Sequence, residues 1–197
     1  MKTLLLIAGA YLLASVPYGY LLYYWRYRED IRTKGSGNIG GTNVLREGGF
    51  LLGLGTTLLD ILKAFLPVLL AVHLLGKGTI GPFWVWGAAV CGHMFSVFLK
   101  GKGGKGVASF VGGALALDFP RTLMGIALFF LVLLPTRFVS LASLTASLAL
   151  TFLMLHAYGL AAWPAILWTG LVFWKHRENI RRLKAGTERR LFDKKGE

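Results

Sequence analysis

The chain has 197 residues, of which 55% are hydrophobic and 16% are charged, and its mean hydropathy is +0.59. A soluble domain of this length carries about 25% charged residues, so the composition excludes a water-soluble globule and indicates an integral membrane protein. The net charge of +13 does not point to a nucleic-acid partner, because the basic residues lie in loops between apolar blocks and in the tail. Cys91 is the only cysteine, so we expect no disulfide framework and no Cys/His metal site. We also expect no cofactor.

Seven apolar blocks follow one another along the sequence. They cover residues 3–25, 50–76, 79–99, 106–117, 121–135, 138–158 and 160–174. A helix needs about 20 apolar residues to cross roughly 30 Å of hydrocarbon, so the blocks predict an all-α polytopic bundle of about seven transmembrane helices in one domain, 1–197. The first block runs through Trp25 into a basic cluster, which favours a retained span over a signal peptide. The fourth and fifth blocks are short for spans, which leaves five or six crossings open.

The Lys and Arg residues are distributed unequally between the two ends of the blocks. If the N-terminus is outside and all seven blocks cross, 18 of the 22 fall inside; Lys2, Lys77 and Arg121 fall outside, and Lys63 lies within a block. The positive-inside rule then places the C-terminus in the cytoplasm.

The first of three polar segments is 35–46, which contains four glycines, two amides, two hydroxyls and Arg46. Glycines allow positive φ angles, and successive backbone N–H groups in such a turn form an anion-binding nest. Arg46 has the geometry for bidentate contact with a phosphate. The alternative is a flexible surface loop without a ligand.

The second polar segment, 100–106, interleaves four glycines with Lys100, Lys102 and Lys105 just before an apolar block. A glycine-rich loop that enters a helix N-terminus offers unpaired N–H groups and a positive dipole end to an anion. The spacing is not that of a Walker A loop. The alternative is a loop whose lysines serve only membrane topology.

The third polar segment, 176–188, follows the last apolar block. Helical spacing would place His176, Asn179 and Leu183 on one face, so that His176 and Asn179 point jointly at a site. Histidine is the natural proton acceptor near neutral pH. The alternative is a solvated basic tail.

Ionisable residues also occur inside the apolar blocks. Asp60 and Lys63 have i, i+3 spacing, and we expect a structural ion pair rather than a direct catalytic role. His93 is expected either to bond between helices or to belong to the wall of the site.

The three polar segments resemble the motifs of the bacterial acyl-phosphate:glycerol-3-phosphate acyltransferases, the PlsY family. Those motifs are S-G-N-x-G-A-T-N-x-x-R, K-G-G-K-G-V-A-[ST] and H-x-x-N-[IL]-x-R-L-x-x-G-x-E, and residues 36–46, 102–109 and 176–188 match them in order. Asp60-x-x-Lys63 and Gly92-His93 also match, and the resemblance covers essentially the whole chain. The departures are exchanges between small residues, which cast little doubt on the chemistry: Gly41, Ala64, Ser96 and Ser109.

The resemblance implies transfer of a fatty acyl group from acyl phosphate to the 1-hydroxyl of sn-glycerol 3-phosphate, giving lysophosphatidic acid and phosphate. It implies a multi-pass monomer in the bacterial inner membrane with its active site facing the cytoplasm. The expected partners are the two substrates, membrane lipid and a soluble enzyme that produces acyl phosphate.

The resemblance also assigns roles to individual residues. The expected catalytic residues are Ser36, Arg46, Lys105, His176, Asn179 and Glu188. The expected substrate-binding residues are Gly37, Asn38, Gly40, Thr42, Asn43, Lys102, Gly103, Gly104, Gly106 and Ser109, with Asp60, Lys63 and His93 in support. Lys105 and the amides of 103–106 would hold the glycerol phosphate, and Ser36, Thr42, Asn43 and Arg46 the acyl phosphate. His176 and Asn179 would orient or deprotonate the hydroxyl, unless the substrate's own phosphate is the base, and Glu188 would brace the basic cluster. Direct transfer is favoured over a Ser36 acyl-enzyme, because no base lies beside Ser36 in the sequence.

Three other functions compete with this interpretation. A transporter or flippase for a phosphorylated metabolite would share the basic loops, but it would tend to show paired half-repeats with broken helices. An acyl-thioester-dependent acyltransferase commonly carries H-x-x-x-x-D, and none of the four histidines has an Asp five residues later. A CDP-alcohol transferase would need a spaced Asp cluster, which the sequence lacks.

Overall fold

The structure is a computed structural model that describes residues 1–191. Two of the tail residues counted in the charge distribution, Lys194 and Lys195, lie outside the described residues. Within them all regular structure is helical. The α-helices are α1 (Lys2–Ala14), α2 (Tyr18–Tyr27), α3 (Gly41–Gly48), α4 (Phe50–Leu75), α5 (Ile80–Met94), α6 (Val107–Leu117), α7 (Phe119–Thr136), α8 (Val139–Tyr158), α9 (Pro164–Lys175) and α10 (Arg177–Lys184). Three short 3-10 helices cover Ile31–Thr33, Val97–Leu99 and Gly159–Ala162.

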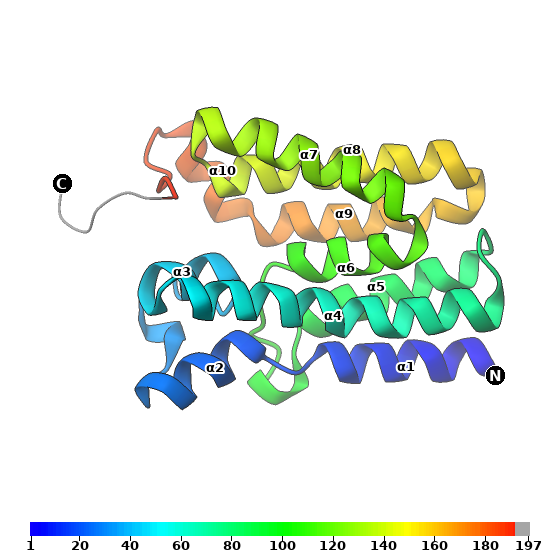
Figure 1. Ribbon diagram of the computed structural model, residues 1–197, viewed down its shortest axis with the longest axis horizontal. Helices are drawn as coiled ribbons and strands as arrows, with labels where there is room; N and C mark the ends of the chain where they lie inside the picture. The colour runs from blue at the N-terminus through cyan, green and yellow to red at the C-terminus, as the bar shows by residue number, and fades with distance from the viewer. Residues whose placement is uncertain (192–197) are drawn as a thin grey trace.

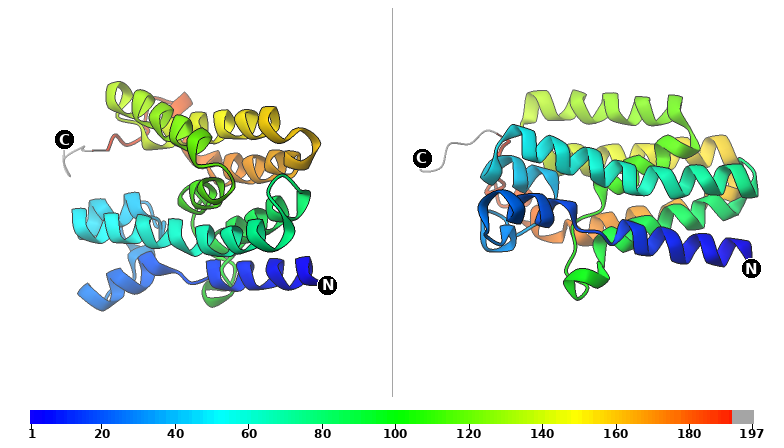
Figure 2. Two further views of the ribbon diagram at one scale, coloured as in Figure 1. Left: turned by 45° about the vertical axis from the view of Figure 1, so that its right-hand side comes forward. Right: turned by 60° about the horizontal axis from the view of Figure 1, so that its bottom comes forward.

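The long helices run side by side along the longest axis of the molecule (Figure 1). Helices α1, α4 and α5 form one layer, α7, α8 and α9 form the other, and α6 lies between them (Figures 1 and 2). The short helices α2, α3 and α10 gather at one end of the bundle, which we call the polar end, and the N-terminus lies at the other end. All three polar segments of the sequence therefore meet at one end.

Five segments are long and apolar enough to cross a membrane: Lys2–Tyr27, Phe50–Leu75, Ile80–Leu99, Phe119–Thr136 and Val139–Ala162. The fifth apolar block, which is short in the sequence, lies in an 18-residue helix. Helices α6 and α9 have 11 and 12 residues. At 1.5 Å per residue each covers roughly half of the hydrocarbon thickness. Of the seven expected blocks, five therefore lie in candidate spans, within the range of five to seven crossings that the sequence left open, and two lie in the short helices α6 and α9.

Helix α6 is short because the chain before it folds back into the bundle. Ser109 Oγ in its first turn donates to the Asp60 carbonyl oxygen at 3.1 Å, about midway along α4. A Cβ on Gly112 would overlap the Ile61 carbonyl, so glycine is what lets α6 and α4 approach each other closely. The loop that precedes α6 consequently reaches well inside the length of α4.

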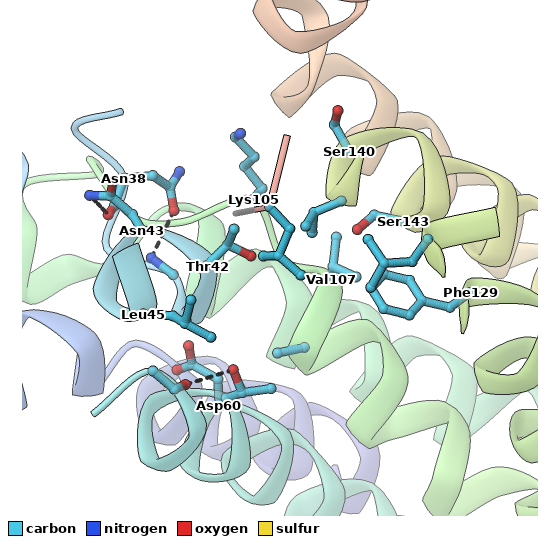
Figure 3. A pocket seen from close by; sticks show the side chains of 18 of the residues that line it. Asn38, Thr42, Asn43, Leu45, Asp60, Lys105, Val107, Phe129, Ser140 and Ser143 are labelled. Carbon is cyan, nitrogen blue, oxygen red and sulfur yellow. Dashed lines mark hydrogen bonds between the residues drawn. The ribbon is translucent and has the colours of Figure 1, made fainter. Parts of the chain in front are cut away.

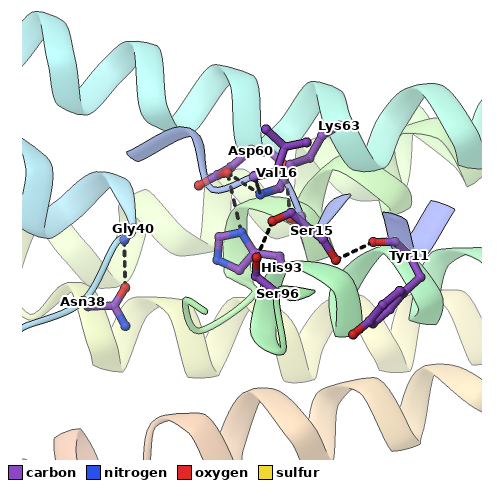
Figure 4. A network of polar contacts seen from close by, with 10 residues as sticks. Tyr11, Ser15, Val16, Asn38, Gly40, Asp60, Lys63, His93 and Ser96 are labelled. Atoms are coloured by element: carbon purple, nitrogen blue, oxygen red, sulfur yellow. Dashed lines mark hydrogen bonds and ion pairs between the residues drawn. The ribbon is translucent and has the colours of Figure 1, made fainter. Parts of the chain in front are cut away.

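A buried polar network joins α1, α4 and α5 (Figure 4). Lys63 Nζ lies 2.7 Å from Asp60 Oδ1, and both side chains are at most 2% exposed. Lys63 also donates to the Val16 carbonyl at 2.8 Å, where the chain leaves α1. His93 Nδ1 faces Asp60 Oδ1 at 3.5 Å. The expected structural ion pair is present, and it ties the second span to the break between α1 and α2.

Candidate functional site

A cavity of about 740 Å³ opens between the two layers of the bundle, with its polar part toward the polar end. Its wall combines the three polar segments with the apolar faces of α4, α6, α7 and α8. Figure 3 shows Asn38 and Thr42 of the first segment, Lys105 of the second, and Phe129 of α7 around this space. Every expected catalytic residue lines it: Ser36, Arg46, Lys105, His176, Asn179 and Glu188. The apolar part is lined by residues such as Phe129, Leu133 and Leu150.

The first polar segment is held in shape by Asn43. Its Oδ1 accepts from the Ser36 backbone N–H at 2.9 Å, and its Nδ2 donates to the carbonyls of Asn38 (2.9 Å) and Lys34 (3.2 Å). Gly35 and Gly37 have φ angles of +56° and +70°, a region that glycine enters without steric cost. The Asn43 side chain therefore makes its hydrogen bonds within the loop. This arrangement places the exposed Ser36 at the rim of the cavity.

Arg46 connects the first polar segment to the C-terminal segment. Its Nη2 donates to the carbonyl oxygens of Arg189 and Arg190, at 3.2 and 2.9 Å. The Leu191 N–H in turn donates to the Arg137 carbonyl at 2.8 Å, at the corner between α7 and α8. The segment from Gly186 to Leu191 thus passes across the polar end from one layer to the other.

The second polar segment anchors its glycines on α5. The N–H groups of Gly103 and Gly104 donate to the carbonyls of Met94 (3.2 Å) and His93 (3.0 Å), where α5 ends. A Cβ on Gly104 would overlap the His93 ring, and one on Gly103 would overlap the His93 carbonyl oxygen. Both amides are therefore hydrogen-bonded within the protein, to main-chain carbonyls at the end of α5.

The cavity instead receives the end of this segment and the start of α6. Lys105, Gly106, Val107 and Ala108 line it, and Gly106 is the N-cap of α6 with a φ of +86°. The positive end of the α6 dipole thus faces the cavity beside Lys105. Of the other expected site residues, Asn38, Gly40, Thr42, Asn43, Asp60 and His93 also line the cavity. Those among the described residues that do not line it are Gly37, Lys63, Lys102, Gly103, Gly104 and Ser109.

A chain of hydrogen bonds joins the second and third polar segments. Lys105 Nζ donates to Asn179 Oδ1, and Asn179 Nδ2 donates to Glu188 Oε1, both at 2.6 Å. Glu188 also accepts from Ser140 Oγ at 2.6 Å and from Arg182 Nε at 2.7 Å. Asn179 therefore fixes Lys105 through one end of its amide and Glu188 through the other.

Burial shifts the pKa values of this cluster. It lowers the pKa of Lys105 to about 8, although the Glu188 carboxylate opposes the shift. Burial, with the charge of Lys105, lowers the pKa of His176 to about 4. For Glu188 burial raises the pKa, but hydrogen bonds from Ser140, Asn179 and Arg182 outweigh it, and the net pKa is lowered. At neutral pH the cluster therefore holds a cationic Lys105, a neutral His176 and an anionic Glu188.

The tautomer of His176 follows from its neighbour. Nδ1 lies 2.8 Å from the Val172 carbonyl oxygen, which can only accept, so Nδ1 carries the proton. Nε2 of the neutral ring then has a lone pair available for a substrate hydroxyl.

Sequence reasoning missed Ser140, Ser143 and Ser147 of α8, which are buried and line the cavity. Their i, i+3, i+7 spacing puts them on one helix face, and that spacing was the available signal. It also missed Arg182, the ion-pair partner of Glu188.

Comparisons with known proteins agree with one another. A family model described as glycerol-3-phosphate acyltransferase matches residues 4–186. Glycerol-3-phosphate acyltransferases of Geotalea daltonii and Pseudomonas aeruginosa are 45% and 44% identical; the alignments cover 94% of this chain in both cases and 95% and 97% of the relatives. A crystal structure of PlsY, an integral membrane glycerol 3-phosphate acyltransferase in its glycerol 3-phosphate form, matches with a TM-score of 0.94 and 37% identity over 98% of this chain and 96% of that one. A lysophosphatidic acid form of PlsY matches with a TM-score of 0.90, 36% identity and coverage of 96% and 95%. The chain therefore belongs to the glycerol-3-phosphate acyltransferase family.

Proposed function

We propose that this protein transfers a fatty acyl group from acyl phosphate to the 1-hydroxyl of sn-glycerol 3-phosphate, releasing phosphate and lysophosphatidic acid. The observation that carries the proposal is the cavity itself, because cationic and amide groups from three distant segments meet at the mouth of an apolar space. The related crystal structures are of a glycerol 3-phosphate form and a lysophosphatidic acid form, which are a substrate and the product of this reaction.

The two phosphate groups are assigned to opposite walls of the polar part. Lys105 and the N-terminal amides of α6 hold the glycerol phosphate, since a cation and a positive dipole end coincide there. Ser36, Thr42 and Arg46 hold the acyl phosphate, whose alkyl chain extends between the two layers, along the apolar faces of α7 and α8 that line the cavity. Gly103 and Gly104 then act by shaping the loop rather than by touching substrate.

The chemical step forms one bond and breaks one. The 1-hydroxyl oxygen attacks the acyl carbon, and the bond from this carbon to the bridging phosphate oxygen breaks, with its electron pair leaving on phosphate. Because the mixed anhydride has a good leaving group, positioning and charge neutralisation supply much of the catalysis. No base contacts Ser36 Oγ within the described residues, which favours direct transfer over an acyl-Ser36 intermediate.

The hydroxyl proton passes to a substrate phosphate, and His176 orients the hydroxyl through Nε2. A pKa of about 4 makes His176 a weak base, whereas a phosphate monoester has a second pKa near 6. The contrary case, with His176 as the base, predicts a step in the pH profile of kcat that disappears in His176→Gln.

The finer topology is also a proposal. The five candidate spans and the two short helices α6 and α9 carry the chain back and forth along the bundle (Figure 1). Most Lys and Arg residues lie in the segments 26–46, 100–105 and 175–190, which flank these helices at the polar end. By the positive-inside rule the N-terminus is outside, and the site faces the cytoplasm of the bacterial inner membrane. We further propose that the protein is a monomer with a single acyltransferase domain, and that a soluble enzyme produces its acyl phosphate.

The deciding experiment offers purified protein acyl phosphate, acyl-CoA or acyl carrier protein together with labelled glycerol 3-phosphate. We expect labelled lysophosphatidic acid only when acyl phosphate is the acyl donor. Lys105→Ala should abolish the signal, whereas Lys102→Ala, in the same loop but outside the cavity, should retain it. Movement of label between liposome compartments without product would favour the transporter, and product from a thioester donor would contradict the assigned donor.

A further inference from the structure

Two buried residues, Asp60 and His93, lie directly beneath the loop that carries Lys105. Both line the cavity, yet they are only 2% and 3% exposed. Neither belongs to the three polar segments, and the reaction as described above gives neither of them a task.

The loop is attached to α5 through the main chain of His93 and its neighbour. A helix leaves its last carbonyls without intrahelical partners, and the N–H groups of Gly103 and Gly104 fill that role for Met94 and His93. Because these amides cap α5, the path of the loop is set by where the end of α5 lies.

The side chain of His93 sets the distance between the loop and the end of α5. The imidazole lies against Gly104 so closely that a Cβ there would overlap Nε2. Lys105 follows in the next position, and its Nζ reaches Asn179 Oδ1 at 2.6 Å. A displaced ring would therefore displace the ammonium group that points into the cavity.

Asp60 holds both His93 and the far end of the loop. Its carboxylate faces His93 Nδ1 at 3.5 Å, and its carbonyl accepts from Ser109 Oγ at 3.1 Å in the first turn of α6. Lys63 pairs with the same carboxylate but otherwise bonds to Val16, away from the loop. The loop is thus supported by His93 at its beginning and by Asp60 at its end (Figure 4 shows the pair).

We propose that Asp60 and His93 are positioning residues for glycerol 3-phosphate, because they fix the loop that aims Lys105 and the start of α6 into the cavity. This inference rests on the proposed function and extends it to two residues that touch no phosphate. It predicts a selective effect, since the first polar segment, assigned to acyl phosphate, does not rest on this pair.

The first test separates the two substrates. We expect His93→Ala to raise KM for glycerol 3-phosphate by about tenfold to a hundredfold, the size expected when a binding group moves by about 1 Å, and to leave KM for acyl phosphate within about twofold. His93→Asn, which retains a donor near the position of Nδ1, should recover part of the loss. Equal rises in both KM values, or no rise in either, would overturn the proposal.

The second test uses the contact between His93 and Gly104. Gly104→Ala should raise KM for glycerol 3-phosphate, because the new methyl group meets the His93 ring. In the double variant with His93→Ala that overlap is gone, so the combined loss should be smaller than the product of the two single losses. Gly103→Ala is the matched control, because its methyl group meets the main-chain carbonyl of residue 93. His93→Ala retains that carbonyl, so the double variant with Gly103→Ala should show no recovery of KM.

Thermal unfolding of each detergent-solubilised variant shows whether a loss comes from the loop or from the whole bundle. Additive losses for Gly104→Ala with His93→Ala, in variants that melt like wild type, would contradict the positioning role. Wild-type protein that makes no lysophosphatidic acid would instead contradict the proposed function.

Discussion

At the scale of single residues, Lys105 is the group that we propose holds the glycerol phosphate. Burial weakens its hold on the proton and Glu188 strengthens it, and the balance leaves a pKa of about 8. The ammonium form is therefore complete at acidic pH and is lost as the pH rises through 8.

This pKa predicts how substrate binding depends on pH. Lys105 is about 90% charged at pH 7 and about 10% charged at pH 9, so KM for glycerol 3-phosphate should rise as much as tenfold between these values. Lys105→Arg keeps its charge throughout and should flatten the profile, whatever it costs in absolute rate. Steady-state kinetics at fixed acyl phosphate measures the slope, with Lys102→Arg as the control that should keep the wild-type slope. An unchanged slope in Lys105→Arg would assign the titration to another group.

Glu188 is the residue whose loss should do most damage to the structure of the site. It accepts hydrogen bonds from Ser140, Asn179 and Arg182. Glu188→Gln keeps the shape of the side chain, but its amide NH2 group would face the hydrogen-bond donors of these residues. The substitution also leaves Arg182 without the carboxylate of its ion pair. We expect the free energy of unfolding to fall by about 1–3 kcal/mol and activity to fall with it. Denaturant titration of Glu178→Gln, whose carboxylate makes an exposed pair with Arg181, should show a change near zero.

At the scale of elements, the sequence predicted the helices better than their connections. The long apolar blocks became α4, α5, α7 and α8 because each buries backbone polar groups that lipid cannot satisfy. Whether the short block 106–117 crosses was left open by the sequence, because hydropathy does not show that the N–H groups of Gly103 and Gly104 turn back to cap α5. Helical spacing likewise placed His176 and Asn179 on one face. It could not predict that Ser140 donates to Glu188, because these two residues lie far apart in the chain.

The first polar segment should lose its shape when Asn43 is changed. Asn43→Ala removes the hydrogen bonds to Ser36, Asn38 and Lys34, each contributing about 1 kcal/mol. We expect kcat to fall at least tenfold and KM for acyl phosphate to rise, because the loop that presents Ser36 to the cavity loses the hydrogen bonds that hold its shape. Thr33→Ala, which removes one exposed hydrogen bond just before this segment, should behave like wild type. If KM for glycerol 3-phosphate rose instead, the two phosphates would have to be assigned the other way round.

At the scale of the whole molecule, the two ends of the bundle have different chemistry. The polar end carries the three polar segments, and the fold brings them to a single cavity although the first and the third are about 140 residues apart in the sequence. Exposed Lys77 marks the opposite end, between α4 and α5. One shared cavity for two phosphorylated substrates requires that the polar segments face one side of the membrane.

Labelling from each side of the membrane tests this requirement. In a Cys91→Ser background, single cysteines are introduced as Lys77→Cys, Lys102→Cys and Glu178→Cys, all at exposed positions. The positive-inside rule predicts that a membrane-impermeant maleimide modifies Lys77→Cys in intact spheroplasts, but modifies Lys102→Cys and Glu178→Cys only in inverted vesicles. Agreement of the last two is the decisive result, because they report on the second and third polar segments independently. If one reacted in spheroplasts and the other in inverted vesicles, Lys105 and Asn179 could not share a hydrogen bond, and the cavity between the layers could not be the site of acyl transfer.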